Sequence, residues 1–132
     1  MVEPTSILKD VRHAVVSFDD DDSFDRDLIL YINGALMVLN QIGVGPEKPF
    51  RITGEDETWA DFLGEQEELL PLVQPYVIHK VTYNFDTPTS TTRNEALINL
   101  IAEDEWRLNV AVDPTAEEIE DLRAEMAERQ RV

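Results

Sequence analysis

The side chains of this sequence that could do chemistry are its many carboxylates and its two histidines. The densest acidic cluster is the run Asp19–Asp22, which is similar to the start of a calcium-binding loop. Such a loop needs glycine at its sixth position and glutamate at its twelfth. Counted from Asp19, these positions hold Phe24 and Leu30, so the calcium pattern fails. The run is interpreted instead as a solvated loop that leads into a helix.

The two histidines, His13 and His79, lack the spacing of metal ligands, and neither stands in a motif that marks a catalytic base. The sequence contains no glycine-rich phosphate loop and no G-x-S-x-G motif. Its lack of cysteine excludes thiolate zinc sites, thiol nucleophiles and disulfide bonds. We therefore expect a protein that is not an enzyme, with no catalytic residue, no metal site and no cofactor.

The adjacent residues Trp106 and Arg107 allow two interpretations. In the first, Trp106 closes the core and Arg107 pairs with Glu103, one helical turn earlier. In the second, both lie at the centre of a protein interface, where tryptophan and arginine are enriched. The two interpretations are compatible, and the sequence leaves both open.

The formal net charge of −17, from 28 acidic and 11 basic residues, is the strongest compositional feature. A protein that grips duplex DNA generally places several lysines or arginines on phosphates, so a DNA-binding groove is not expected. Two explanations of the acidity stay open. The charge can serve solubility, or it can form a surface that meets DNA without holding it.

Length and hydropathy limit the architecture. The 132 residues suffice for one domain with a buried core. The first four residues are neither basic nor apolar enough for a signal peptide. The longest strongly apolar stretch, Leu28 to Leu39, is too short to span a bilayer. These features predict a soluble protein made inside the cell, without a membrane partner.

The elements that must position these residues are helices, organised around one turn. Asp86 and Pro88 end the preceding helix, because the residue before a proline is pushed out of helical geometry. Thr89 or Ser90 then caps a helix from about Thr91 to Asn109. Its apolar positions recur at three- and four-residue spacing: Ala96, Leu97, Leu100, Ile101 and Leu108. We interpret this turn and helix as the hub of a helical protein that assembles with copies of itself.

The longest apolar helix is expected from about Phe24 to Ile42, capped by Asp22 or Ser23. Gly43 suits the left-handed residue just beyond its end. The helix is apolar most of the way round, which indicates burial on most sides. It is either an ordinary central helix or one that a neighbouring subunit partly covers.

Four further elements follow from local signals. A short first helix begins after Thr5 or Ser6, a loop runs from Val44 to Glu57, and Thr58 with Asp61 forms a capping box for a short helix. Pro71 marks the first turn of the helix before the Asp86 turn, and Pro75 is expected to kink it.

The last part of the chain is expected to form a separate arm. Asp113 and Pro114 break the preceding helix, and Thr115 with Glu118 forms a capping box for a final one. Its apolar side carries Ile119, Leu122 and Met126. The predicted fold is therefore all-α: a small bundle of about four to five helices with a long loop (residues 1–112), followed by an acidic amphipathic arm helix (residues 113–132).

Five short motifs follow one another along the chain. They are Leu39-Asn40-Gln41-Ile42-Gly43, Thr58-Trp59-Ala60-Asp61-Phe62, Pro75-Tyr76, Phe85-Asp86-Thr87-Pro88-Thr89-Ser90 and Glu105-Trp106-Arg107-Leu108-Asn109. In order and spacing they resemble the head–tail connector proteins of tailed bacteriophages, over about residues 6 to 112. Relatives often have two prolines in the turn, where this chain has Thr87 in place of the first.

The resemblance implies a structural virion protein, also called a head-completion, adaptor or DNA-packaging protein, which is made in the host cytoplasm and located in the neck. Its copies would form a ring, typically a dodecamer, beneath the portal protein. The ring would extend the DNA channel, let DNA pass without specific binding, and offer a surface to the next neck or tail-completion protein.

The resemblance also suggests residue roles. The expected subunit-interface residues are Trp106, Arg107, Asp86, Pro88 and Trp59. The expected portal-docking residues are Ile119, Leu122 and Met126. The expected acidic lining of the channel is Asp19, Asp20, Asp21 and Asp22, with the acidic stretch from Glu55 to Glu68 as the other candidate. A different class also fits the composition: a free acidic binding module, such as a DNA-mimicking inhibitor of a basic protein.

Overall fold

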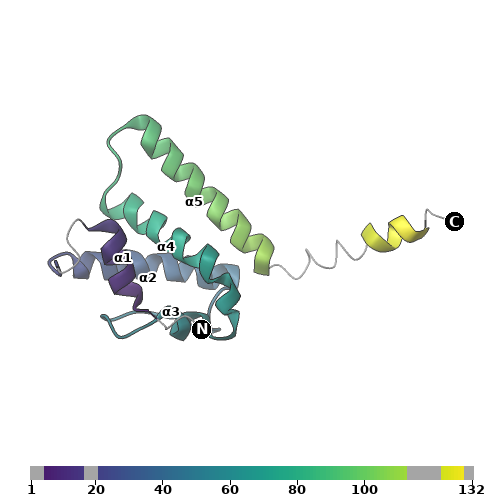
Figure 1. Ribbon diagram of the computed structural model, residues 1–132, viewed down its shortest axis with the longest axis horizontal. Coiled ribbons are helices and arrows are strands. Elements are labelled where there is room, and N and C mark those ends of the chain that lie inside the picture. The colour runs from purple at the N-terminus through teal and green to yellow at the C-terminus, as the bar shows by residue number, and fades with distance from the viewer. Residues whose placement is uncertain (1–4, 17–20, 113–122, 130–132) are drawn as a thin grey trace.

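The computed structural model describes residues 5–16, 21–112 and 123–129, and this part of the chain is helical (Figure 1). The packed elements are α1 (Ile7–Val15), α2 (Asp25–Ile42), α3 (Trp59–Leu63), the 3₁₀ segment η1 (Gly64–Leu69), α4 (Leu70–Phe85) and α5 (Thr91–Val112). Residues 123–129 are helical as well. The described residues form no β-strand, only an isolated bridge between Ser6 and Thr58. The predicted all-α class is confirmed.

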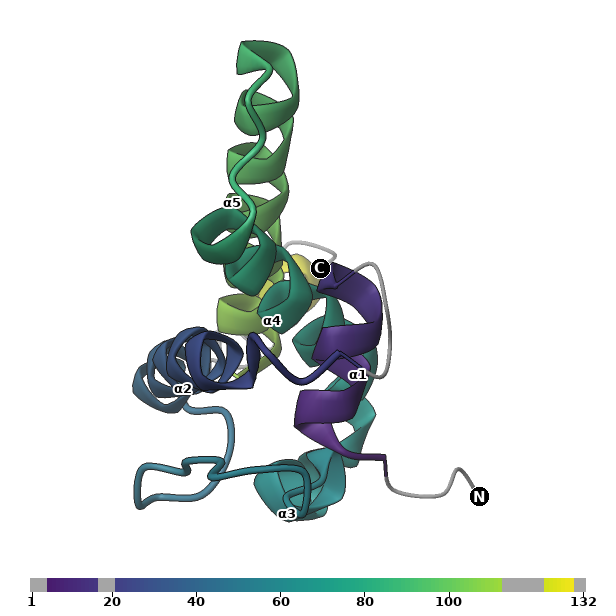
Figure 2. The same cartoon turned by 90° about the vertical axis from the view of Figure 1, so that its left-hand side faces the viewer.

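Helix α4 lies at the centre of the bundle, where it packs against α1, α2 and α5. Figure 2 shows α2 nearly end-on, with α1 and α4 beside it and α5 above. The core side chains of α2 are Leu28, Ile32, Ala35, Leu36 and Leu39, and those of α4 are Val73, Tyr76, Val77 and Val81. Burying one such apolar side chain contributes about 1.5–3 kcal/mol, so these side chains form a large part of the hydrophobic core.

Helix α1 is fastened to the segment that leads into α3. The Ile7 N–H donates to the Glu57 carbonyl at 3.1 Å, and the Trp59 N–H donates to the Thr5 carbonyl at 3.2 Å. The Trp59 indole Nε1–H donates to the Asp10 carboxylate at 2.8 Å. Contacts across about fifty residues of sequence therefore hold the first helix in place.

The start of α2 differs from the prediction. Its N-cap is Phe24, which makes no side-chain capping hydrogen bond, so the predicted caps Asp22 and Ser23 are wrong. Ser23 is otherwise engaged, because its N–H donates to the Asp21 carboxylate at 3.0 Å and its hydroxyl donates there too. Asp25 lies in the first turn, where its charge is favourable to the helix dipole.

Other helix ends agree with the prediction. Gly43 ends α2 in the left-handed conformation, with φ of 109°. Thr58 and Asp61 form both hydrogen bonds of the capping box at α3. Ser6 caps α1, and Pro71 lies in the first turn of α4, which continues through Pro75 to its end.

The turn between α4 and α5 is built from local hydrogen bonds. The Asp86 N–H donates to the Thr82 carbonyl at 2.8 Å, which ends α4. At the start of α5, the Ser90 carbonyl accepts from the Asn94 N–H at 2.9 Å, and its hydroxyl accepts from the Arg93 N–H at 3.5 Å. Ser90 is therefore the cap of the two candidates. In Figures 1 and 2 the first turns of α5 project beyond the rest of the bundle.

Candidate assembly surfaces

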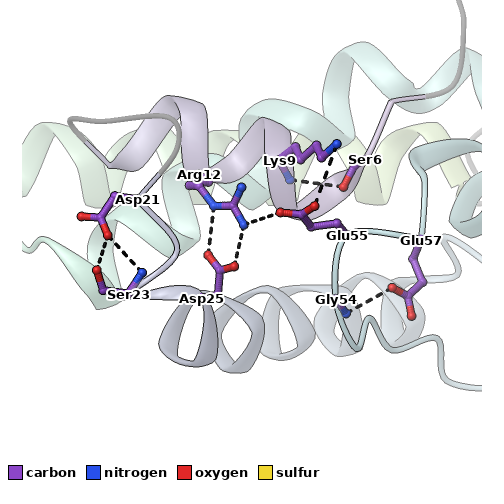
Figure 3. Close-up of polar contacts among 9 residues, drawn as sticks. All are labelled: Ser6, Lys9, Arg12, Asp21, Ser23, Asp25, Gly54, Glu55 and Glu57. Carbon is purple, nitrogen blue, oxygen red and sulfur yellow. Dashed lines mark hydrogen bonds and ion pairs between the residues drawn. The ribbon is translucent and has the colours of Figure 1, made fainter.

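The most developed polar cluster of the described residues centres on Arg12, whose side chain is almost fully buried (Figure 3). Its Nε and Nη2 donate to the two carboxylate oxygens of Asp25 at 2.9 and 2.5 Å. Nη2 also donates to Glu55 at 2.8 Å, which lowers the pKa of Glu55, and the bond to Asp25 raises the pKa of Arg12. The cluster joins α1, the start of α2 and the long loop, so its role is structural.

The sequence interpretation missed this cluster, because its three members are far apart along the chain. The one available signal was Arg12 itself, a cation one position after Val11 on the apolar side of the first helix.

A second polar cluster shapes the loop from Val44 to Glu57. Burial raises the pKa of Glu57, but hydrogen bonds from the Thr53 hydroxyl and from the Thr53 and Gly54 N–H groups outweigh it and leave that pKa below its ordinary value. Asn33 of α2 binds Ile52 twice: its Nδ2 donates to the Ile52 carbonyl at 3.1 Å, and its Oδ1 accepts from the Ile52 N–H at 2.8 Å. The loop is thus fixed to α2.

The structure places two residues of the predicted channel lining, Asp21 and Asp22, just before α2. Hydrogen bonds from the Ser23 hydroxyl and N–H lower the pKa of Asp21, so this carboxylate is ionised near neutral pH. Asp19 and Asp20 lie outside the described residues. Across the described ranges, no group of three or more potential ligand side chains forms a metal site.

Trp106 does not close the core, since 66% of its surface is exposed on α5. That interpretation is wrong, whereas the predicted pair of Arg107 with Glu103 is present at 2.5 Å. The side of α5 that faces the bundle instead carries Leu97, Ile101 and Leu108.

Trp106 belongs to a row of apolar residues spaced four apart, on a side of α5 that faces away from the core. We name this row the α5 ridge; its members are Ile98, Ala102, Trp106 and Val110, all of them exposed. Residues at four-residue spacing form a continuous ridge on a helix surface, which suits packing against a second helix.

The other predicted interface residues occupy different settings. Trp59 is only 2% exposed and is bound to Asp10, so its side chain offers no surface to a neighbour. Asp86 is exposed and Pro88 half-buried in the turn before α5. These two residues shape the turn that carries the α5 ridge.

A second exposed apolar surface lies on α2. We name it the α2 face; it consists of Leu30, 66% exposed, Met37, 40% exposed, and the exposed Gly34 between them. The sequence indicated a helix that is apolar most of the way round, and the single chain leaves its Leu30 and Met37 side chains exposed.

The predicted docking residues of the arm are described only in part. Met126 lies in the helical segment 123–129 and is 60% exposed. Ile119 and Leu122 lie outside the described residues, as does the predicted break after Val112. Within the described ranges, no helix is both long and apolar enough to cross a membrane.

Comparison with known proteins identifies a family. Residues 7–115 match the family described as Phage connector protein, which covers every packed helix of the structure. No curated protein and no solved structure matches the chain.

Proposed function

Because the chain belongs to the phage connector protein family, we propose that it acts as a head–tail connector whose copies form a ring, typically a dodecamer, beneath the portal. The family is structural rather than enzymatic, and it implies association with other proteins of the virion neck. The family match from residue 7 to 115 is the observation that carries this proposal.

Two exposed apolar surfaces support assembly. The α5 ridge and the α2 face are both uncovered in the single chain, although the chain is small and strongly acidic. Contiguous exposed apolar patches on soluble proteins commonly mark protein–protein contacts. A free DNA-mimicking module would need carboxylates on its working surface, so these apolar surfaces and the family favour the connector.

The acidic composition suits a channel that conducts DNA. Each lysine or arginine on a phosphate strengthens retention of the duplex, whereas carboxylates repel phosphates and leave the duplex able to slide. In this proposal the lumen is lined by Asp19–Asp22 or by the stretch from Glu55 to Glu68, and DNA passes without specific binding.

The arm, residues 113–132, is proposed to reach the portal with Ile119, Leu122 and Met126 as apolar contacts. The opposite side of the ring would receive the next neck or tail-completion protein. This division of roles leaves the helical domain to build the ring and the arm to place it.

The test is a truncation after Val112, compared with the full chain. We expect circular dichroism to show that the helical domain remains folded, because its core residues lie before the cut. We expect the truncated protein to lose capture by purified portal, and electron microscopy of full chain with portal to show a ring at the portal base.

A milder variant is the full chain with Met126→Ala, which truncates one of the proposed contact side chains. This variant should weaken capture by portal without abolishing it. Undiminished capture of the truncated protein would show that the docking segment lies elsewhere. A full chain that never associates with portal would remove the connector role.

A further inference from the structure

We infer that the α5 ridge of one protomer packs across the α2 face of the next protomer, with Trp106 seated over Gly34. The inference rests on the proposed ring and names the two surfaces that form its subunit contact.

Gly34 is the first step of the argument. A glycine inside a helix destabilises it relative to alanine, and it is usually kept for a left-handed conformation or a close backbone approach. Gly34 has no positive φ, unlike Gly43, Gly45 and Gly64. A Cβ built at Gly34 would meet no atom within 4 Å. Nothing inside the protomer therefore requires glycine there, and a close approach from outside explains it.

The side chains around Gly34 give that approach a shape. Leu30 precedes it by one turn and Met37 follows it by one turn, and both are exposed. The α2 face is therefore two apolar side chains with a gap between them. On the α5 ridge the order is reversed, since the large Trp106 stands between Ala102 and the smaller Val110. A ridge with a central bulge fits a groove with a central gap.

Charge favours this pairing over contact between two α5 ridges. Glu95 and Glu103 border the ridge, and Arg107 pairs with Glu103, so the border keeps an excess of negative charge that two facing ridges would bring together. On α2 no charged residue occurs from Leu28 to Ile42, in a chain whose net charge is −17. This surface is neutral from Leu28 onward and has Arg26 and Asp27 at its edge, so an acid-bordered ridge meets little repulsion there.

The contact joins two different surfaces of the same chain. Such a head-to-tail contact uses one donor surface and one acceptor surface on every copy, and it closes into a ring when the rotation between copies permits. Trp106 is then the central anchor, a residue type enriched at the energetic centres of interfaces.

The experiment is disulfide cross-linking, for which the natural chain is suitable because it has no cysteine. One protein carries Gly34→Cys and a second carries Ala102→Cys, which keeps Trp106 intact. A third carries Ala60→Cys, an exposed alanine of α3 outside both surfaces, as the matched control. Each mixture is oxidised at a salt concentration of about 1 M, where the screening length is about 3 Å, and again on purified portal.

We expect the mixture of Gly34→Cys and Ala102→Cys chains to give at least about tenfold more covalent dimer than either protein mixed with Ala60→Cys. A chain carrying both substitutions should give a ladder of covalent oligomers. Adding Trp106→Ala to the Ala102→Cys chain should reduce the dimer to the control level. Thermal melts of each variant, monitored by circular dichroism, confirm that the cysteine chains remain folded.

Two results would overturn the inference. One is Ala102→Cys protein that cross-links with itself as efficiently as with Gly34→Cys, which means that the ridges face each other. The other is cross-linking at the control level in both conditions. Portal capture by the wild-type chain separates the two proposals. Capture without the cross-link would contradict only this subunit contact. The cross-link without capture would contradict only the connector role.

Discussion

Arg12 shows what a single side chain does in this fold. It is 5% exposed and binds two carboxylates, one from the start of α2 and one from the long loop. A buried cation is tolerated only when it is paired and hydrogen-bonded, and here three bonds meet that requirement. The same bonds fix the relative positions of three segments.

We predict that Arg12→Met lowers the free energy of unfolding by about 2–3 kcal/mol. The substitution removes the cation from Asp25 and leaves Glu55 with only Lys9 at 3.9 Å. The loss stays below that of a fully buried pair because both carboxylates are partly exposed. Urea unfolding followed by circular dichroism measures the change. Arg26→Met, at an exposed position of α2, is the control and should stay within about 0.5 kcal/mol of wild type. An Arg12 variant as stable as this control would contradict the structural role assigned to Arg12.

Alanine substitutions at two glycines, Gly34 and Gly45, should change the stability of the protein in opposite directions. Gly34→Ala should raise the free energy of unfolding by about 0.5–1 kcal/mol, because alanine favours the helix and its Cβ meets nothing. Gly45→Ala should destabilise, because Gly45 has φ of 90° and its added Cβ would lie 2.5 Å from the Phe62 ring. Thermal melts of the two variants test this pair, and a Gly34→Ala protein less stable than wild type would show that the protomer itself needs this glycine.

At the scale of elements, α2 holds the middle of the long loop at Ile52. The paired hydrogen bonds between Asn33 and Ile52 work like one rung of backbone pairing, with an amide side chain in place of a strand. Ile52 is buried, so its N–H and carbonyl would otherwise be left without partners inside the protein.

We predict that Asn33→Ala destabilises the protein by about 1–3 kcal/mol, because it leaves two buried backbone groups without partners. Hydrogen exchange should report the effect locally, with the Ile52 amide losing protection while the amides of α4 keep theirs. Asn99→Ala, at an exposed position of α5, is the matched control. Unchanged protection at Ile52 would show that the loop is held by other contacts.

Most elements could be predicted because their signals are local. The capping box of Thr58 and Asp61 spans three residues of sequence, and Gly43 stands directly after its helix. The start of α2 was mispredicted because Ser23 forms a local turn with Asp21 and the helix begins one residue later, with Phe24 as its N-cap. Local chemistry therefore identifies helix ends unless a neighbouring turn offers the capping residue another partner.

The candidate surfaces were less predictable, because their exposure depends on packing between distant segments. The apolar spacing of α5 predicted its core-facing side in part, because Leu97, Ile101 and Leu108 are buried, whereas Ala96 and Leu100 are exposed. The outcome left Trp106 outside and Leu97, Ile101 and Leu108 inside. Trp59, predicted at a subunit interface, is instead buried inside the protomer, where Asp10 of the first helix accepts its indole N–H.

At the scale of the whole molecule, charge opposes assembly. Copies that carry −17 each repel one another over a screening length of about 8 Å at physiological salt. Contact between the apolar surfaces has to outweigh this repulsion, so a template that holds the copies together favours the ring.

We predict a mostly monomeric protein in dilute buffer at low salt, with association that rises as salt is added and a ring that forms readily on purified portal. Light scattering and sedimentation velocity across a salt series measure this. A small protein with no net charge, measured across the same salt series, serves as the control for non-specific salting out. Stable rings at low salt without portal would contradict this account of the charge.

The fastening of α1 has a consequence for synthesis of the chain. The partners of its first residues, Glu57 and Trp59, leave the ribosome about fifty residues after Thr5 and Ile7. At about 5–20 residues per second, α1 waits on the order of several seconds with its apolar side uncovered. The hairpin of α4 and α5, whose partners are adjacent in the chain, has no such delay. Helix α1 therefore lacks part of its packing surface until residues 57–59 and α4 have been made.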